Sequence, residues 1–291
     1  MDVEFRHLEP FGQEITGIQC WHPLSEPLDA QIAHVWSRDG LILLRRQALS
    51  ETELVNFCAP LGKAEIIVRE DWRSDNRPEV IRISNIKDQH GRSVGGLGAG
   101  ELDWHTDQSY VVKPATGSVL YMVEMPAVPP RTYWANLQLA YAALDDERKA
   151  QIDGLNVVYD YLVRQSTYDD EPQMSAELRR KTPPVTHPLV NSHPLTGEKA
   201  LYLDPTTASG IEGMEPTAAK QLLGELCDHA TQDAFVYAHD WQIGDVVMWD
   251  NGFLMHRRDS FEPTGLRLLK RLTLNLPATR HIVPEGSEFL V

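Results

Sequence analysis

His105-Thr106-Asp107 places an imidazole and a carboxylate two positions apart, and His256 follows 149 residues after Asp107 (256 − 107). In a strand the side chains alternate between the two faces, so His105 and Asp107 project to one side while Thr106 points away. His256 can join them only if the fold brings two remote segments together. This requirement constrains the fold more than any other feature of the sequence.

These three side chains suit a metal ion. Two imidazoles and one carboxylate on one face, with the opposite face open, are the ligand set of non-haem iron(II) oxygenases. A zinc-dependent hydrolase can use the same ligands with a bound water, and a non-catalytic metal-binding jelly-roll module needs nothing more. The alternative without a metal is that His-x-Asp forms a surface ion pair. The ligands alone leave these alternatives open.

The segment before His256 reads Gly-Asp-Val-Val-Met-Trp-Asp-Asn-Gly-Phe-Leu-Met from residue 244 onward. Two apolar runs separated by Asn251-Gly252 are typical of a hairpin. We therefore expect His256 to end a core strand.

Two arginines follow His256 at fixed distances, Arg267 after 11 residues and Arg271 after 15. Positions four apart share a face in a strand or a helix. In a strand, Arg267, Leu269 and Arg271 face one way, and the other face carries Leu268, Lys270, Leu272, Leu274 and Leu276. A guanidinium binds a carboxylate in two-point fashion, so this face is predicted to hold an anion beside the metal.

A family resemblance rests on these features together. It is carried by Trp104-His105-Thr106-Asp107-Gln108-Ser109-Tyr110, by the stretch 244–251, by His256 and by the Arg267/Arg271 pair. Through nearly its whole length, the chain resembles the taurine dioxygenase and 2,4-dichlorophenoxyacetate dioxygenase family of iron(II)/2-oxoglutarate oxygenases. The spacing of ligands and arginines is far more specific than His-x-Asp alone.

The resemblance implies roles for individual residues. His105, Asp107 and His256 would hold Fe(II), with 2-oxoglutarate as cosubstrate and O2 as oxidant. Arg267 would bind the far carboxylate of 2-oxoglutarate, and Thr132 stands where a threonine of the family assists. Arg271 would lie near the cosubstrate and meet an anionic group of the primary substrate.

The implied reaction is hydroxylation of an unactivated C–H bond in an apolar organic acid, while 2-oxoglutarate becomes succinate and CO2. An aryloxyalkanoate and a natural-product intermediate both fit, and desaturation or cyclisation stays open. Taurine enzymes place a histidine and a tyrosine where this chain has Glu-Ile-Ile-Val-Arg at 65–69, which disfavours taurine, and Glu101 is a further departure from their asparagine. The candidate substrate-binding residues, for which ordinary core packing is the alternative, are Ile67, Glu101, Tyr110, Phe253 and Arg271.

For the fold, the resemblance implies a double-stranded β-helix, or jelly roll, with flanking helices, while periodicity alone indicates mixed α/β dominated by antiparallel strands. Ser50 with Glu53 is a capping-box signal for a helix. Other helices are predicted at 28–38, 137–152 and 217–230, and strands at 41–44, 80–84, 118–124, 131–135, 155–161, 199–204, 234–238, 245–249 and 270–276. Residues 1–291 are interpreted as a single domain. Residues 163–186 lack a period and are predicted to be a mobile lid insertion.

Composition excludes some partners. With 27 basic and 42 acidic side chains, the net charge of −15 disfavours nucleic acid. A small carboxylate can still bind in a local positive pocket. Three scattered cysteines indicate neither disulfides nor a zinc cluster, and no apolar run is long enough to cross a membrane. We expect a cytoplasmic enzyme that acts on a small-molecule substrate, and homo-oligomers are common among the relatives.

Overall fold

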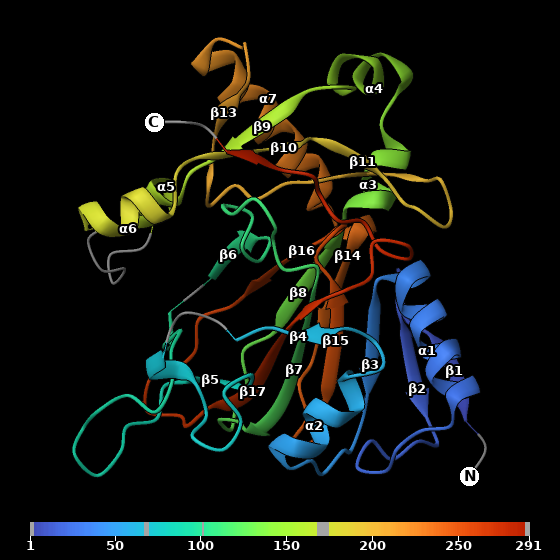
Figure 1. Ribbon diagram of the computed structural model, residues 1–291, viewed down its shortest axis with the longest axis vertical. Coiled ribbons are helices and arrows are strands. Elements are labelled where there is room, and N and C mark those ends of the chain that lie inside the picture. The colour runs from blue at the N-terminus through green and yellow to red at the C-terminus, as the bar shows by residue number, and fades with distance from the viewer. Residues whose placement is uncertain (1–2, 67–69, 101, 168–174, 289–291) are drawn as a thin grey trace.

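The computed structural model describes residues 3–66, 70–100, 102–167 and 175–288 (Figure 1). Its larger sheet has the strand order β1-β2-β3-β15-β7-β17-β4, and β5 also pairs with β17. β2 and β3 run parallel, whereas the other paired strands of this sheet are antiparallel. The strands are β1 (Glu4–His7), β2 (Gln13–Thr16), β3 (Leu41–Leu44), β4 (Lys63–Ala64), β5 (Ile81–Ser84), β7 (Gly117–Glu124), β15 (Val246–Asp250) and β17 (Leu268–Asn275).

A second, antiparallel sheet has the order β14-β8-β16-β6. Its strands are β6 (Leu102–His105), β8 (Thr132–Asn136), β14 (Val236–His239) and β16 (Leu254–Arg258). Buried side chains of both sheets pack in one cluster, in which Trp249 and Leu269 of the larger sheet meet Trp134 and Leu254 of the smaller. The two sheets therefore enclose a common interior, as the predicted jelly-roll core with mainly antiparallel strands requires.

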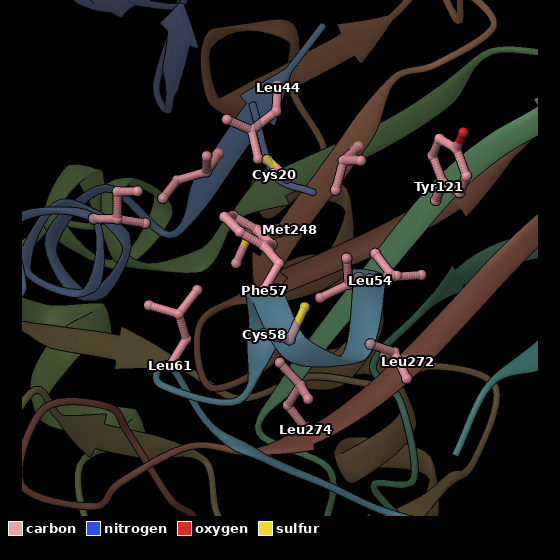
Figure 2. Close-up of a cluster of buried hydrophobic side chains, with 14 of the residues drawn as sticks. Cys20, Leu44, Leu54, Phe57, Cys58, Leu61, Tyr121, Met248, Leu272 and Leu274 are labelled. Atoms are coloured by element: carbon pink, nitrogen blue, oxygen red, sulfur yellow. The ribbon is translucent and has the colours of Figure 1, made fainter. Parts of the chain in front are cut away.

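Two helices cover the outer face of the larger sheet, α1 (Glu26–Asp39) and α2 (Glu51–Cys58). Their apolar side chains pack on Met248, Leu272 and Leu274 (Figure 2). The predicted capping box begins α2: Glu53 N donates to Ser50 Oγ at 3.2 Å, and Ser50 N donates to Glu53 Oε2 at 2.7 Å. The predicted alternation along β17 is also confirmed, because Leu272 and Leu274 face these helices and Leu269 faces the interior.

A third layer packs above the smaller sheet in Figure 1 around a separate cluster of buried side chains. It contains α3 (Leu137–Ala143), α4 (Asp146–Ile152), α7 (Pro216–Ala230), β9 (Asn156–Tyr159), β10 (Val185–Pro188), β11 (Val190–Ser192), β12 (Lys199–Leu201), β13 (Ala208–Ile211) and β18 (Ser287–Glu288). Short 3₁₀ turns lie at Glu70–Trp72 and Asp233–Phe235.

Three details differ from the predictions. The helix expected over 137–152 is two helices, because the Asp145 side chain accepts from Arg148 N at 2.7 Å and begins a new helix. The apolar pattern of 137–152 predicts that Leu139 faces inward, but Leu139 is 37% exposed. The apolar runs flanking Asn251-Gly252 do not form a hairpin: β15 and β16 belong to different sheets, so this step crosses the interior and His256 lies within β16.

The segment 163–186 is more regular than predicted. Its described part contains the end of α5 (Tyr161–Thr167), all of α6 (Ala176–Lys181) and the start of β10, and residues 168–174 lie outside the described ranges. Asp160 links the two helices: its carboxylate accepts from Leu162 N at 2.9 Å and pairs with Arg179 at 2.5 Å. A lid function for this segment stays a prediction.

The three cysteines are free, and Cys20 and Cys58 are buried. Burial raises the pKa of the Cys20 thiol to about 12, so it remains protonated and unreactive. In the described ranges, no helix is both long and apolar enough to cross a membrane.

Several histidines outside the His105/His256 pair are held neutral in the interior. Burial lowers the pKa of His187, His193 and His239 below the usual 6.5. As the pH falls below 6.5, these histidines bind protons in the unfolded chain but stay neutral in the folded chain, so acid favours unfolding. We therefore expect the urea midpoint of the metal-free protein to fall steadily from about pH 7.5 to about pH 5.5, with a shallower slope for His187→Gln. A flat or rising midpoint would contradict this expectation.

Candidate active site

The two predicted histidine ligands lie on neighbouring strands. β6 and β16 pair antiparallel with His105 opposite His256, and the imidazole centroids are 4.1 Å apart. Asp107 follows just beyond the end of β6. One ligand atom from each of the three residues lies within 4.8 Å of the others, and all three side chains are buried. The structure thus brings together the three residues that the sequence separates.

Hydrogen bonds fix which atoms face a metal. His105 Nδ1 lies 2.7 Å from the Asp103 carbonyl oxygen, to which it donates, so His105 Nε2 is left for coordination. Asp107 Oδ1 lies 3.8 Å from His256 Nε2. The other oxygen, Asp107 Oδ2, accepts from Ser118 Oγ at 2.7 Å and pairs with Arg271 Nη2 at 2.5 Å. Asp107 Oδ1 is therefore the oxygen that faces His256, while Oδ2 is held by Ser118 and Arg271.

The protonation states suit metal binding. Burial alone would raise the pKa of Asp107, but the charge of Arg271, with His256 and His105, lowers it far below the usual range. Burial is the largest cause of the lowered pKa of both His105 and His256. An ionised carboxylate and two neutral imidazoles are the forms that coordinate a divalent cation, so this donor set fits iron(II).

Arg271 contacts the candidate metal site through Asp107. Besides its ion pair with Asp107, Arg271 Nη2 donates to Ser118 Oγ at 3.2 Å, and its guanidinium lies 5.9 Å from the Trp249 ring centroid. The same Trp249 ring is 4.8 Å from the His256 ring. The expected contacts of Arg271 with cosubstrate and substrate stay predictions.

Arg267 is a buried cation with no counter-ion among the described residues. It directly precedes β17 and is 2% exposed, and its backbone is held by Asn85 and Ser84. Its Nε has no hydrogen-bond partner, and within the described ranges no carboxylate lies at ion-pair distance. Burial, followed by the charge of Arg258, lowers the pKa of Arg267 well below its usual value. An uncompensated interior guanidinium is costly, and a bound anion such as the far carboxylate of 2-oxoglutarate would offset that cost.

Thr132 begins β8 and is buried. It shares a face of β8 with Trp134, which packs in the interior between the sheets. Its Oγ1 accepts from the indole Nε1 of Trp241 at 2.9 Å. Thr132 is in register with Arg258 of β16, and Arg258 and Arg267 flank the same Phe261 ring, at 5.4 and 5.7 Å.

The predicted substrate-binding residues have different surroundings. The Tyr110 ring contacts the ring of Tyr161, the first residue of α5, with centroids 4.8 Å apart and the ring planes tilted by 51°. Phe253 is fully buried, against Gly40 and the His193 ring, which is the environment of a core side chain. Ile67 and Glu101 lie outside the described residues.

Arg164 of α5 was missed by the sequence analysis. After burial, its charge contributes to the lowered pKa of both His105 and His256, so this cation lies within electrostatic reach of the metal ligands. The segment 163–186 had no periodicity that would have placed Arg164 on a helix. Ser118 and Trp241 were missed as well, because their contacts join segments far apart in the sequence.

Comparison with known proteins agrees with this geometry. Residues 4–273 match the model of the "Taurine catabolism dioxygenase TauD, TfdA family". The chain is 29% identical over 300 residues to the alpha-ketoglutarate-dependent 2,4-dichlorophenoxyacetate dioxygenase of Burkholderia sp. (strain RASC), covering 100% of both chains. It is 30% identical to the (S)-phenoxypropionate/alpha-ketoglutarate-dioxygenase of Sphingobium herbicidovorans, covering 89% of this chain and 90% of the relative.

A solved structure, AAD-2 in complex with Mn(II) and N-oxalylglycine, superposes with a TM-score of 0.81 at 26% identity, covering 95% of this chain and 98% of the other. The zinc hydrolase and the non-catalytic module, which the three ligands left open, gain no support from these relatives. The chain belongs to the TauD, TfdA family and is an iron(II)- and 2-oxoglutarate-dependent dioxygenase.

Proposed function

We propose that the enzyme hydroxylates an unactivated C–H bond of a small, largely apolar organic acid and converts 2-oxoglutarate to succinate and CO2. One observation carries the proposal: three buried ligand atoms converge within 4.8 Å in an interior that also holds Arg267, a buried guanidinium with an unpartnered Nε. A metal alone would not need this arginine. A metal that binds an anionic cosubstrate would.

In the proposed mechanism, His105, Asp107 and His256 hold iron(II), which when bound activates O2 and supplies the oxidising power for C–H cleavage. Arg267 and Thr132 bind the far carboxylate of 2-oxoglutarate and so fix its orientation. Arg271 and Ser118 hold Asp107 Oδ2 and keep the carboxylate charged. The protein performs little proton chemistry; its side chains orient the reactants and exclude water.

We propose that residues 1–291 act as one domain, with α5 and α6 as a cover over the metal side. Two contacts support this arrangement. The tilted ring contact of Tyr161 with Tyr110 attaches α5 to the segment just after Asp107, and Asp160 joins α5 to α6 through Arg179.

The substrate acid needs a cation of its own. After burial, the charge of Arg164 contributes to the lowered pKa of both His105 and His256, and we therefore propose Arg164 as the residue that binds the substrate carboxylate. Arg164 is three residues after Tyr161, so both lie on the same face of α5, the face that Tyr161 turns toward Tyr110. Tyr110 and Tyr161 then offer an aromatic surface to the apolar part of the substrate. The relatives named for dichlorophenoxyacetate and phenoxypropionate are consistent with an acid of this kind.

Replacing Arg164 by glutamine tests this assignment. We expect kcat/KM for the acid substrate to fall by about 10- to 100-fold, because a charge-assisted contact is lost, while the KM for 2-oxoglutarate stays unchanged. Preference for the acid over its methyl ester should fall equally. The matched control is Arg180→Gln, on the exposed surface of α6, which should behave like wild type. An unchanged preference in Arg164→Gln would exclude the role.

The function itself is tested by incubating the iron(II) enzyme, 2-oxoglutarate and O2 with a panel of aryloxyalkanoic and other apolar carboxylic acids. Substrate-dependent succinate release and a product that has gained one oxygen atom are expected. Loss of two hydrogens would indicate desaturation or cyclisation instead. Hydrolysis by the zinc-loaded protein without O2 would overturn the proposal. Assembly into a homo-oligomer stays a prediction, which light scattering can test.

A further inference from the structure

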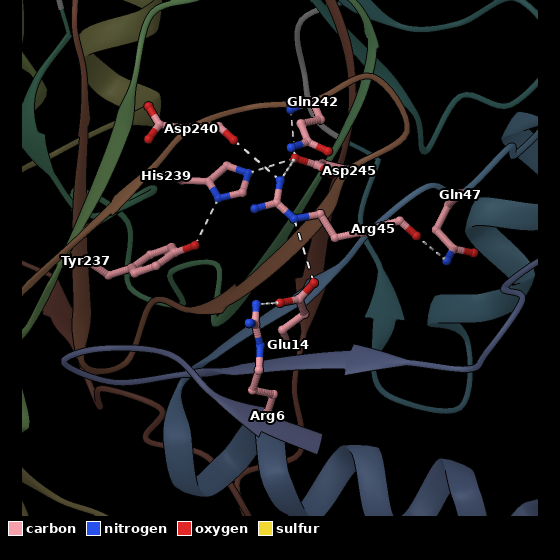
Figure 3. Close-up of polar contacts among 9 residues, drawn as sticks. All are labelled: Arg6, Glu14, Arg45, Gln47, Tyr237, His239, Asp240, Gln242 and Asp245. Carbon is pink, nitrogen blue, oxygen red and sulfur yellow. Dashed lines mark hydrogen bonds and ion pairs between the residues drawn. The ribbon is translucent and has the colours of Figure 1, made fainter. Parts of the chain in front are cut away.

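A buried polar network surrounds Asp245 (Figure 3), and its His239 is in register with Thr132 at the start of β8. Asp245 is fully buried, and its Oδ2 accepts from Arg45 Nη1 at 2.7 Å, from Gln242 N at 2.8 Å and from His239 Nε2 at 3.0 Å. Because Asp245 Oδ2 already accepts from Arg45 and from Gln242 N, we assign the His239 proton to Nε2, and Nδ1 then accepts from the Tyr237 hydroxyl at 3.0 Å. Both ring nitrogens are bonded, so the imidazole has one fixed orientation.

The fixed imidazole supports Trp241. The rings of His239 and Trp241 meet edge to face, with centroids 4.7 Å apart at an angle of 88°. Trp241 is 3% exposed, and its Nε1 lies 2.9 Å from Thr132 Oγ1. His239 is itself opposite Thr132 in the pairing of β14 with β8. The His239 ring, fixed by this network, therefore keeps the Trp241 indole in position to donate its N–H to the Thr132 hydroxyl.

This contact determines what the threonine can do. An indole N–H is a donor only, whereas a hydroxyl has one hydrogen to donate and two lone pairs to accept with. Thr132 Oγ1 therefore accepts from Trp241, and its own hydrogen is left for another partner. Within the described ranges, no protein acceptor takes that hydrogen. A carboxylate has acceptor oxygens only, so it fits this position.

We propose that Trp241 is a positioning residue for the cosubstrate: its indole N–H engages one lone pair of Thr132 and directs the threonine hydroxyl hydrogen toward the far carboxylate of 2-oxoglutarate. His239 and Asp245 hold the indole in place. The inference rests on the proposed role of Thr132 in cosubstrate binding. It gives a positioning role to His239 and Asp245, which are not among the candidate metal ligands.

Calorimetric titration of 2-oxoglutarate into the Mn(II)-loaded protein tests the proposal without turnover. Trp241→Phe should weaken binding about fivefold, and Thr132→Val about tenfold, because each removes a hydrogen bond that directs or donates to the carboxylate. The decisive variant carries both changes. It should bind no more weakly than Thr132→Val alone, because the indole acts only through the hydroxyl.

Control variants separate positioning from packing. Trp36→Phe removes the same volume from another fully buried tryptophan, whose indole nitrogen has no partner, and should leave 2-oxoglutarate binding unchanged. Thr132→Ser keeps the hydroxyl and should bind nearly as wild type. If Trp241→Phe does not fold, His239→Gln keeps a donor for Asp245 but removes the ring that supports the indole, and should weaken binding about twofold.

The outcomes distinguish this inference from the proposed function. Wild-type affinity in Trp241→Phe, or losses that multiply in the double variant, would overturn the positioning role while the cosubstrate role of Thr132 stands. Wild-type affinity in Thr132→Val would overturn both. Weakened binding in each single variant, with no further loss in the double variant, would support the inference.

Discussion

Replacing Asp107 by alanine is expected to abolish measurable conversion of 2-oxoglutarate to succinate. Asp107 supplies the one carboxylate among the three candidate ligands, and its Oδ1 faces His256. Loss of a group that only orients a metal ligand typically costs about 10- to 100-fold, so loss of the ligand itself should exceed that range. The measurement is succinate release with saturating iron(II), together with metal content after dialysis.

Ser118→Ala is the matched control for Asp107→Ala. Ser118 donates to Asp107 Oδ2 but is not a ligand, and Arg271 remains as the second partner of that oxygen. We expect a loss of about 10- to 100-fold for this variant, clearly less than for Asp107→Ala. If Asp107→Ala keeps turnover comparable to that of Ser118→Ala, the ligand assignment is wrong.

Replacing Arg267 by glutamine is expected to have opposite effects on binding and on stability. The dissociation constant for 2-oxoglutarate should rise at least about 30-fold, because removing one partner of a buried charge pair costs about 2–5 kcal/mol and about 1.4 kcal/mol is tenfold. The protein without cosubstrate should become more stable, because an interior guanidinium with an unpartnered Nε is removed. Calorimetry and thermal unfolding measure the two effects.

Arg267→Lys is the companion variant. It keeps a positive charge but loses the two-point geometry of the guanidinium, so its affinity for 2-oxoglutarate should fall between those of wild type and Arg267→Gln. A structural arginine would behave differently. If Arg267→Gln lowers the melting temperature of the cosubstrate-free protein and leaves the dissociation constant unchanged, Arg267 serves the fold and not the cosubstrate.

These predictions share one electrostatic basis. The chain carries a net charge of −15, yet Arg267 is buried in its interior and Arg271 is partly buried there. Arg271 is neutralised by Asp107, whereas Arg267 has no carboxylate beside it in the described ranges. The protein therefore retains in Arg267 an electrostatic cost that binding can remove, which is typical of sites organised in advance for a ligand.

Local features could be predicted from the sequence because their causes lie within a few residues. The period of two separated Leu269 from Leu272 on β17, and the short spacing kept Asp107 close to His105 although β6 ends at His105. The Ser50/Glu53 capping box began a helix as expected. Predictions failed where the same local sequence pattern is compatible with two different structures. The helical pattern over 137–152 contained a good N-cap at Asp145, and Asn251-Gly252 turned the chain without pairing its flanking strands.

By itself, the sequence determined the kinds of chemical group available and their local spacing: one imidazole two positions from a carboxylate, and two arginines in phase after a second histidine. Only the tertiary structure decided which groups meet. It set His256 opposite His105 and paired Arg271 with Asp107, and among the described residues it left Arg267 without a carboxylate partner. The physical reason is the sequence distance over which each kind of interaction acts. Side-chain alternation and capping act over a few residues, whereas these contacts depend on the order of strands that are more than a hundred residues apart in the chain.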